Sequence, residues 1–92
     1  MPQTKPEIIS SKIQAEIKRL APNAVVRTEF SGDDTADVYI YAPRRFCDML
    51  ASRAKKLRDA EVRGDKFLTI RILAEDVENM SDEAKAKYGI QG

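Results

Sequence analysis

The sequence predicts a two-layer α+β sandwich, in which helices cover one face of a three-stranded sheet. Apolar residues recur with helical spacing in two segments, alternate with polar residues in three others, and are separated by glycine, proline and aspartate. The predicted helices are residues 5–20 and 43–63, and the predicted strands are residues 24–30, 36–42 and 67–73. With 92 residues, 42% of them hydrophobic and 34% charged, the chain fits a single globular domain over residues 1–92.

The first helix has both a start signal and a stop signal. Thr4 can cap its first turn, and Glu7, three residues later, completes a capping box. Pro22 and Asn23 end the helix. The apolar stripe, spaced four, four and three residues apart, consists of Ile9, Ile13, Ile17 and Leu20. A stripe of four aliphatic residues favours core packing over a membrane or partner-helix face.

The first two strands are predicted to form an antiparallel hairpin, because the turn residues 31–35 connect them. In the second strand, Val38, Ile40 and Ala42 share one face, and Tyr39 and Tyr41 share the other. If the aliphatic set faces the core, the two tyrosines stand on the outer face of the sheet. That face is then in contact with water, with the C-terminal tail or with a partner, and the sequence leaves the three alternatives open.

The second helix begins near Pro43, which suits a first helical turn, and Gly64 ends it. In the third strand Leu68, Ile70 and Ile72 face one side, and the other side carries Phe67, Thr69, Arg71 and Leu73. The second strand, the helix and the third strand form a crossover that is expected to be right-handed. The third strand can lie beside the second, or beside the first with one position skipped.

The tail, residues 74–92, is acidic near its start, with five acids and no base in residues 74–83. Ser81 can cap a short helix that runs through Tyr88, and Gly89 with Ile90 fits a Schellman motif. The residues expected in the core are Ile9, Ile13, Ile17, Leu20, Val26, Phe30, Val38, Ile40, Phe46, Leu50, Leu57, Leu68, Ile70 and Ile72.

This order of elements resembles that of the type II KH-like folds, which include RNA-binding KH domains, ribosome-maturation factors and the BolA proteins. The KH signature is a Gly-x-x-Gly loop between two helices that clamps a nucleic-acid backbone. The nearest glycine here, Gly64, stands alone between Arg63 and Asp65. The chain also has no histidine to support the resemblance to BolA. The resemblance therefore implies a fold and no function.

Composition argues against most catalytic chemistry. The chain has no histidine and one cysteine, Cys47, which excludes Ser–His and Cys–His nucleophile pairs and the usual zinc sites. Arg44 and Arg45 in the first helical turn could lower the pKa of Cys47, but a half-buried core thiol is favoured. We expect no catalytic residue, no cofactor and no metal site, including at the turn residues Asp33 and Asp34.

Several features of the sequence indicate the cellular compartment in which the protein works. A single cysteine precludes an intrachain disulfide and favours a reducing compartment. The first seven residues contain no apolar signal core, and no stretch has the length of a membrane span. Net charge is +1, so no global field draws the chain to nucleic acid or to a membrane. We therefore expect a cytoplasmic protein without membrane contact.

The outer face of the predicted sheet is the candidate functional surface, with Arg27, Glu29, Tyr39, Tyr41, Phe67, Thr69 and Arg71. It can bind a protein or a second copy, since Tyr and Arg are enriched at interfaces. The tail can cover this face through Val77, Met80, Tyr88 and Ile90. Alternatively, the face can remain exposed and be stabilised by cross-strand pairs, or its aromatic residues can stack unpaired bases. The charges of the basic second helix are mostly spaced as ordinary surface pairs, but Arg44 and Arg45 oppose the helix dipole and need another contact.

We predict a small non-enzymatic binding module that acts by self-association or by binding another protein through the sheet face and tail. The alternative is weak binding of RNA or single-stranded DNA. The residues predicted to contact a partner are Arg27, Tyr39, Tyr41, Phe67, Arg71, Arg44 and Arg45.

Overall fold

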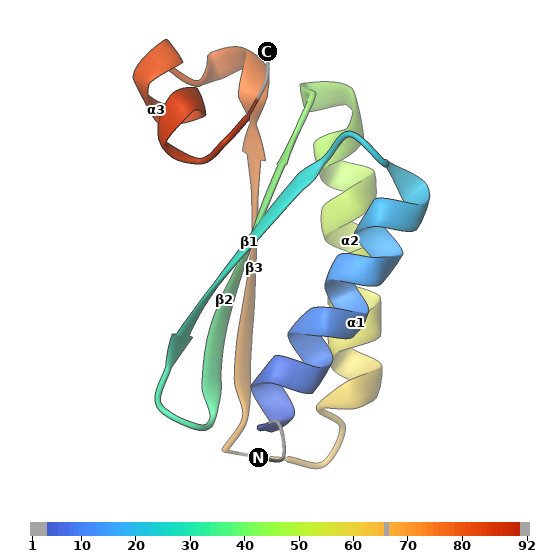
Figure 1. Ribbon diagram of the computed structural model, residues 1–92. Helices are drawn as coiled ribbons and strands as arrows, with labels where there is room; N and C mark the ends of the chain where they lie inside the picture. Colours follow the sequence, from blue (N-terminus) through green and yellow to red (C-terminus); the bar gives the residue numbers. More distant parts are fainter. Residues whose placement is uncertain (1–3, 66, 91–92) are drawn as a thin grey trace.

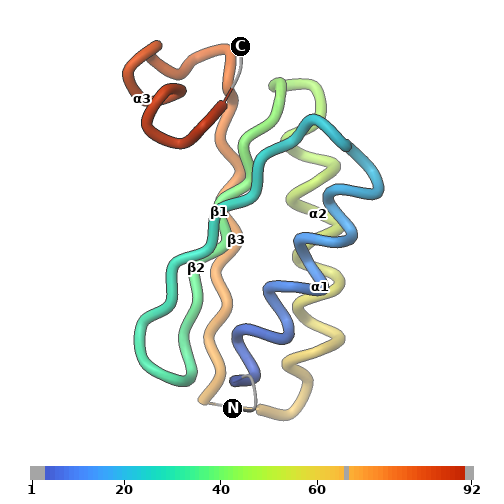
Figure 2. Tube along the Cα trace, viewed as in Figure 1, coloured from blue at the N-terminus to red at the C-terminus, as the bar shows by residue number. Residues whose placement is uncertain are grey.

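The computed structural model describes residues 4–65 and 67–90 and confirms the two-layer α+β architecture (Figure 1). The elements are α1 (Lys5–Leu20), β1 (Val25–Ser31), β2 (Thr35–Ala42), α2 (Arg44–Glu61), β3 (Thr69–Asp76), the 3-10 turn η1 (Val77–Asn79) and α3 (Asp82–Lys87). Helices α1 and α2 lie side by side on one face of the sheet, and α3 lies on the other side. Figure 2 shows that the β1–β2 turn and α3 are at opposite ends of the sheet.

The strand order is β1-β2-β3, with β1 antiparallel and β3 parallel to the central strand β2. The third strand therefore lies beside the second, which decides between the two placements that the sequence allows. The strand register places the residues of the outer face in rows that run across the sheet. In one row Tyr39 lies between Arg27 and Leu73, and the neighbouring row contains Glu29, Asp37 and Arg71. Side chains in one row are direct neighbours across the strands.

The core lies between the sheet and the two long helices. Seven of the expected core residues are buried, namely Ile9, Ile13, Ile17, Val38, Ile40, Leu50 and Ile70. Six others pack against them while partly exposed, namely Leu20, Val26, Phe46, Leu57, Leu68 and Ile72. The prediction for Phe30 is wrong, because its side chain is 49% exposed. It lies on the edge strand β1, where the adjacent part of α1 presents the small residues Ser10 and Ser11.

Four alanines that were not in the expected core list are also buried: Ala24, Ala36, Ala42 and Ala54. Small side chains at such positions allow a helix backbone to approach the sheet closely, so that larger neighbours interdigitate around them. Two further buried residues lie outside this core. Tyr41 belongs to the outer face of the sheet, and Ile90 belongs to the C-terminal segment.

The predicted N-caps of α1 and α3 are present, whereas α2 ends at Glu61, before the predicted stop at Gly64. The Thr4 hydroxyl accepts a hydrogen bond from the Glu7 N–H at the start of α1. At the end of α3, the Ile90 N–H donates to the Lys85 carbonyl at 2.8 Å, and Gly89 adopts a φ of 71°. These are the features of a Schellman motif, in which glycine takes the left-handed conformation without steric cost.

The third strand begins and ends later than expected. The Asp65 carboxylate accepts a hydrogen bond from the Phe67 N–H at 3.1 Å, which holds this segment in a turn before β3 begins at Thr69. Lys66, expected to lead into the strand, lies outside the described residues. At the other end residues 74–76 pair with Ile40–Ala42 of β2, so they belong to the sheet rather than to the tail.

Candidate functional site

The C-terminal segment covers one end of the outer face. The Tyr88 ring stacks on the Tyr41 ring, with centroids 5.3 Å apart and planes inclined by 15°. As a result Tyr41 is only 3% exposed. The buried Ile90 lies nearby and, together with Asn23 and Val25, lines a small hollow at the start of β1. Of the alternatives that the sequence left open, coverage by the tail is what the structure shows for Tyr41.

Arg27 connects this covered end to the middle of the sheet. Its guanidinium carbon lies 4.1 Å from the centroid of the Tyr39 ring and 4.5 Å from that of the Tyr88 ring. Its Nε donates to the Tyr41 hydroxyl at 3.2 Å, and its Nη1 forms an ion pair with Glu29. These contacts stabilise the charged form and raise the pKa of Arg27 above its ordinary value, with the bond to Tyr41 as the largest cause. Two nitrogens of the guanidinium, Nε and Nη1, are therefore engaged within its own chain.

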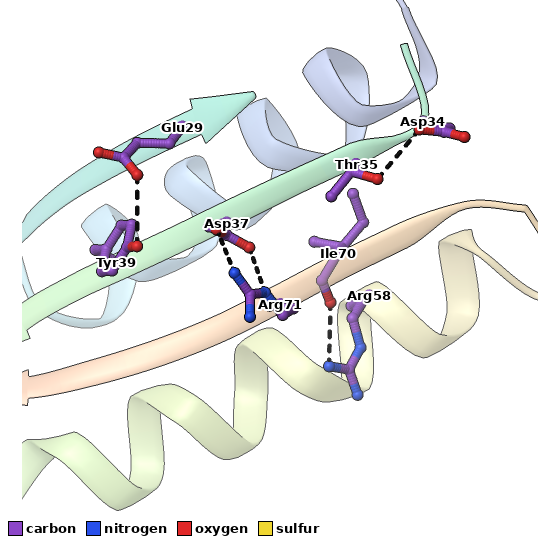
Figure 3. Close-up of polar contacts among 8 residues, drawn as sticks. All are labelled: Glu29, Asp34, Thr35, Asp37, Tyr39, Arg58, Ile70 and Arg71. Atoms are coloured by element: carbon purple, nitrogen blue, oxygen red, sulfur yellow. Dashed lines mark hydrogen bonds and ion pairs between the residues drawn. The ribbon is translucent and has the colours of Figure 1, made fainter. Parts of the chain in front are cut away.

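The adjacent row of the outer face contains a second internal pair (Figure 3). Arg71 on β3 donates from Nε and Nη2 to the two carboxylate oxygens of Asp37 on β2, at 2.6 and 2.7 Å. This bidentate bond lowers the pKa of Asp37. The Tyr39 hydroxyl lies 3.5 Å from a Glu29 oxygen, and burial together with the carboxylates of Glu29 and Asp37 raises the pKa of Tyr39. The uncovered part of the face thus carries alternating, mutually neutralised charges.

Four of the seven predicted contact residues come together on the outer face: Arg27, Tyr39, Tyr41 and Arg71. Phe67 does not join them, because it precedes β3 and lies with Thr4 and Lys5 at the end of the molecule that carries the β1–β2 turn. Its side chain is 82% exposed. Arg44 and Arg45 are exposed at the start of α2, which packs on the opposite face of the sheet.

Of the two arginines whose position at the start of α2 is unfavourable, Arg45 has an additional contact. Both line a shallow hollow with the acidic residues Asp48 and Glu78, and the Arg45 guanidinium lies 4.9 Å from the centroid of the Phe46 ring. The hollow is mixed in charge, and it is separate from the cluster around Arg27.

Cys47 is half-buried, and its thiol lies 3.5 Å from the Ala42 carbonyl oxygen. Burial, followed by the carboxylate of Asp76, raises the pKa of this thiol. A raised pKa lowers the fraction of reactive thiolate and favours the interpretation of Cys47 as a packing residue.

Within residues 4–65 and 67–90, no group of three or more carboxylates and thiols is arranged to hold a metal ion. Over these ranges, too, none of the helices combines the length and apolar character needed to cross a bilayer.

Comparisons of this chain with protein-family models, with curated proteins and with solved structures give no match.

Sequence reasoning missed two partners in this site. Tyr88 was considered only as one of several tail residues, and Asp37 was not recognised as the partner of Arg71. The second omission follows from the undecided strand order, since Asp37 and Arg71 are opposite each other only when β3 pairs with β2 in the observed register. The alternation of Arg27 and Glu29 along β1 was the available signal that charges on this face are balanced.

Proposed function

We propose that this protein is a non-enzymatic binding module whose sheet face binds protein rather than nucleic acid. The observation that carries the proposal is that both arginines of the outer face are already paired with carboxylates of the same chain, Arg27 with Glu29 and Arg71 with Asp37. A phosphate backbone would have to compete with these carboxylates. Tyr and Arg with neutralised charges are typical of protein interfaces. The single cysteine favours a reducing compartment such as the cytoplasm.

The aromatic groups support the same proposal. Base stacking needs an open ring face, and each tyrosine of the cluster has a neighbour on one side. Tyr41 is stacked against Tyr88, and the Arg27 guanidinium lies over the Tyr39 ring. A base that stacked on these covered ring faces would have to displace the tail or Arg27, whereas a protein partner can contact the exposed parts of Glu29 and Arg71 without displacing either.

Site-specific photo-crosslinking tests the proposal. A photoreactive amino acid replaces Tyr39 in cells that make the protein, and the control carries the same amino acid at Ser52, which is exposed on α2. We expect a discrete protein adduct from position 39 that is absent from position 52. Identical adducts at both positions, or adducts to RNA alone, would contradict the proposal.

A titration with mixed single-stranded RNA and DNA at low salt tests the alternative. We expect no saturable binding. Binding that weakens steeply with salt, and that falls by roughly five- to a hundredfold on Tyr39→Ala, would favour the nucleic-acid function instead.

A further inference from the structure

The two edges of the sheet differ in how they are protected. At the β3 edge, the Arg58 guanidinium reaches from α2 and donates to the Ile70 carbonyl at 3.3 Å (Figure 3). At the β1 edge, no side chain of the described residues hydrogen-bonds to the main chain of Val25–Ser31. This strand contains no proline, and it pairs only with β2. An unprotected edge of this kind is a template for pairing with another strand.

The sequence of β1 is complementary to itself when it is reversed about Thr28. We propose that two copies of the chain pair their β1 strands antiparallel, around a two-fold axis that is perpendicular to the sheet and passes midway between the two Thr28 residues. This pairing places each Arg27 directly opposite Glu29 of the second copy. It also places each Val26 directly opposite Phe30 of the second copy.

The second contact covers a ring that the single chain leaves exposed, and the first adds a partner to two side chains that are already paired within their own chain. Glu29 is more than half exposed, so its carboxylate can reach a second arginine across the new strand pair. Phe30, the poorly covered aromatic residue of the helix side, gains an aliphatic neighbour in Val26 of the second copy. Because the axis is perpendicular to the sheet, the helix faces of both copies remain on the same side.

A hollow of about 390 Å³ runs along this edge between α1 and β1. Its lining residues are Glu7, Ser10, Ser11, Gln14, Val26, Thr28 and Phe30. Ser10 is 3% exposed, and its buried hydroxyl has no hydrogen-bond partner in the single chain. In the paired arrangement the two α1 helices flank the strand junction, so that polar side chains of the second copy approach this hollow.

The arrangement closes on itself. Pairing through β1 joins two three-stranded sheets into one, and the outer strands of the joined sheet are both β3. Arg58 occupies one main-chain acceptor at that edge, which disfavours further addition there and favours a dimer over a fibre. This inference concerns the β1 edge and stands independently of what binds the outer face.

Sedimentation equilibrium on the full chain tests the inference. We expect a mass twice that of the 10.4 kDa chain at high concentration. Glu29→Lys places two like-charged pairs in the interface and is expected to raise the dimer dissociation constant about tenfold or more. Arg27→Glu is expected to do the same. A mixture of the two variants restores opposite charges in both pairs, so it is expected to form a heterodimer with an affinity near that of the parent chain.

Two further variants compare the exposed phenylalanines. Phe30→Ser should weaken the dimer, whereas Phe67→Ser, which removes the other exposed ring away from the β1 edge, should leave it unchanged. Thr28→Cys in a Cys47→Ser background should give a disulfide-linked dimer on oxidation, because the two cysteines meet at the axis. A parent chain that stays monomeric at millimolar concentration would overturn the inference. A dimer whose dissociation constant does not change with Glu29→Lys, or a monomer whose β1 edge binds extended peptides, would overturn it as well.

Discussion

The ring of Tyr88 stacks on the ring of Tyr41 at a centroid distance of 5.3 Å, and so attaches the C-terminal segment to the outer face of the sheet. The Arg27 guanidinium lies beside the same cluster, 4.5 Å from the centroid of the Tyr88 ring and 4.1 Å from that of the Tyr39 ring. The tail is thus held by aromatic and cation–π contacts, which are individually small, together with the buried Ile90. This relationship makes the attachment of the tail separable from the stability of the core.

Tyr88→Ala should release the tail without unfolding the domain. Loss of the stacking and cation–π contacts removes about 1–3 kcal/mol from tail attachment. Hydrogen exchange should rise in residues 77–90 and remain slow in β2, and Tyr41 should become more accessible to solvent quenchers. Tyr88→Phe keeps the ring and serves as the control. Unchanged exchange in the tail of the alanine variant would contradict this role of Tyr88.

Arg27→Lys should destabilise the protein more than Arg71→Lys, although both arginines lie on the same face. A guanidinium can lie flat between two rings while it donates to a hydroxyl, and an ammonium cannot reproduce that geometry. We expect a loss of about 1–2 kcal/mol for Arg27→Lys and a clearly smaller loss for Arg71→Lys, whose side chain is exposed to water. Urea denaturation, carried out at a concentration where each variant is monomeric, measures both. Equal losses would show that the contacts of the Arg27 guanidinium with the two rings contribute little.

The Asp37–Arg71 pair should make stability depend on pH in the acidic range. Arg71 lowers the pKa of Asp37 in the folded state below its ordinary value of 3.8. The pair therefore contributes fully above that value, and its contribution is lost as pH falls through the lower folded pKa. Asp37→Asn should cost about 0.5 kcal/mol at pH 7, a small value because the pair is open to water. Thermal denaturation should show that the stability difference between the parent chain and Asp37→Asn shrinks as pH falls below about 4. A stability difference that stays constant down to pH 2 would contradict this role of the ion pair.

Cys47 should react slowly with alkylating reagents. Burial raises the pKa of its thiol above the ordinary value of 9.0, so the thiolate fraction at pH 8 is below that of free cysteine. We expect iodoacetamide labelling of the native protein to be several-fold slower than labelling of a short unfolded peptide around Cys47. Labelling faster than that of the peptide would indicate an activated thiol.

Local sequence patterns determined most of the architecture. The aliphatic stripe of α1, the alternation in β2 and the residues Thr4, Ser81 and Gly89 at helix ends act over a few residues, so each is readable without knowledge of the rest of the chain. The start of β3 was misplaced, because Phe67 fits a strand pattern but is held in a turn by a hydrogen bond to Asp65.

The sequence by itself determined that the chain has one apolar face per strand, an outer face bearing Tyr39 and Tyr41, and no histidine for common catalysis. Only the tertiary structure decided that β3 lies beside β2, that Tyr88 covers Tyr41, and that Phe30 is left exposed at an edge. The physical reason is that strand order, tail docking and edge exposure depend on contacts between segments far apart in the chain. Their free energies come from packing between those distant segments, which no local pattern of residues encodes.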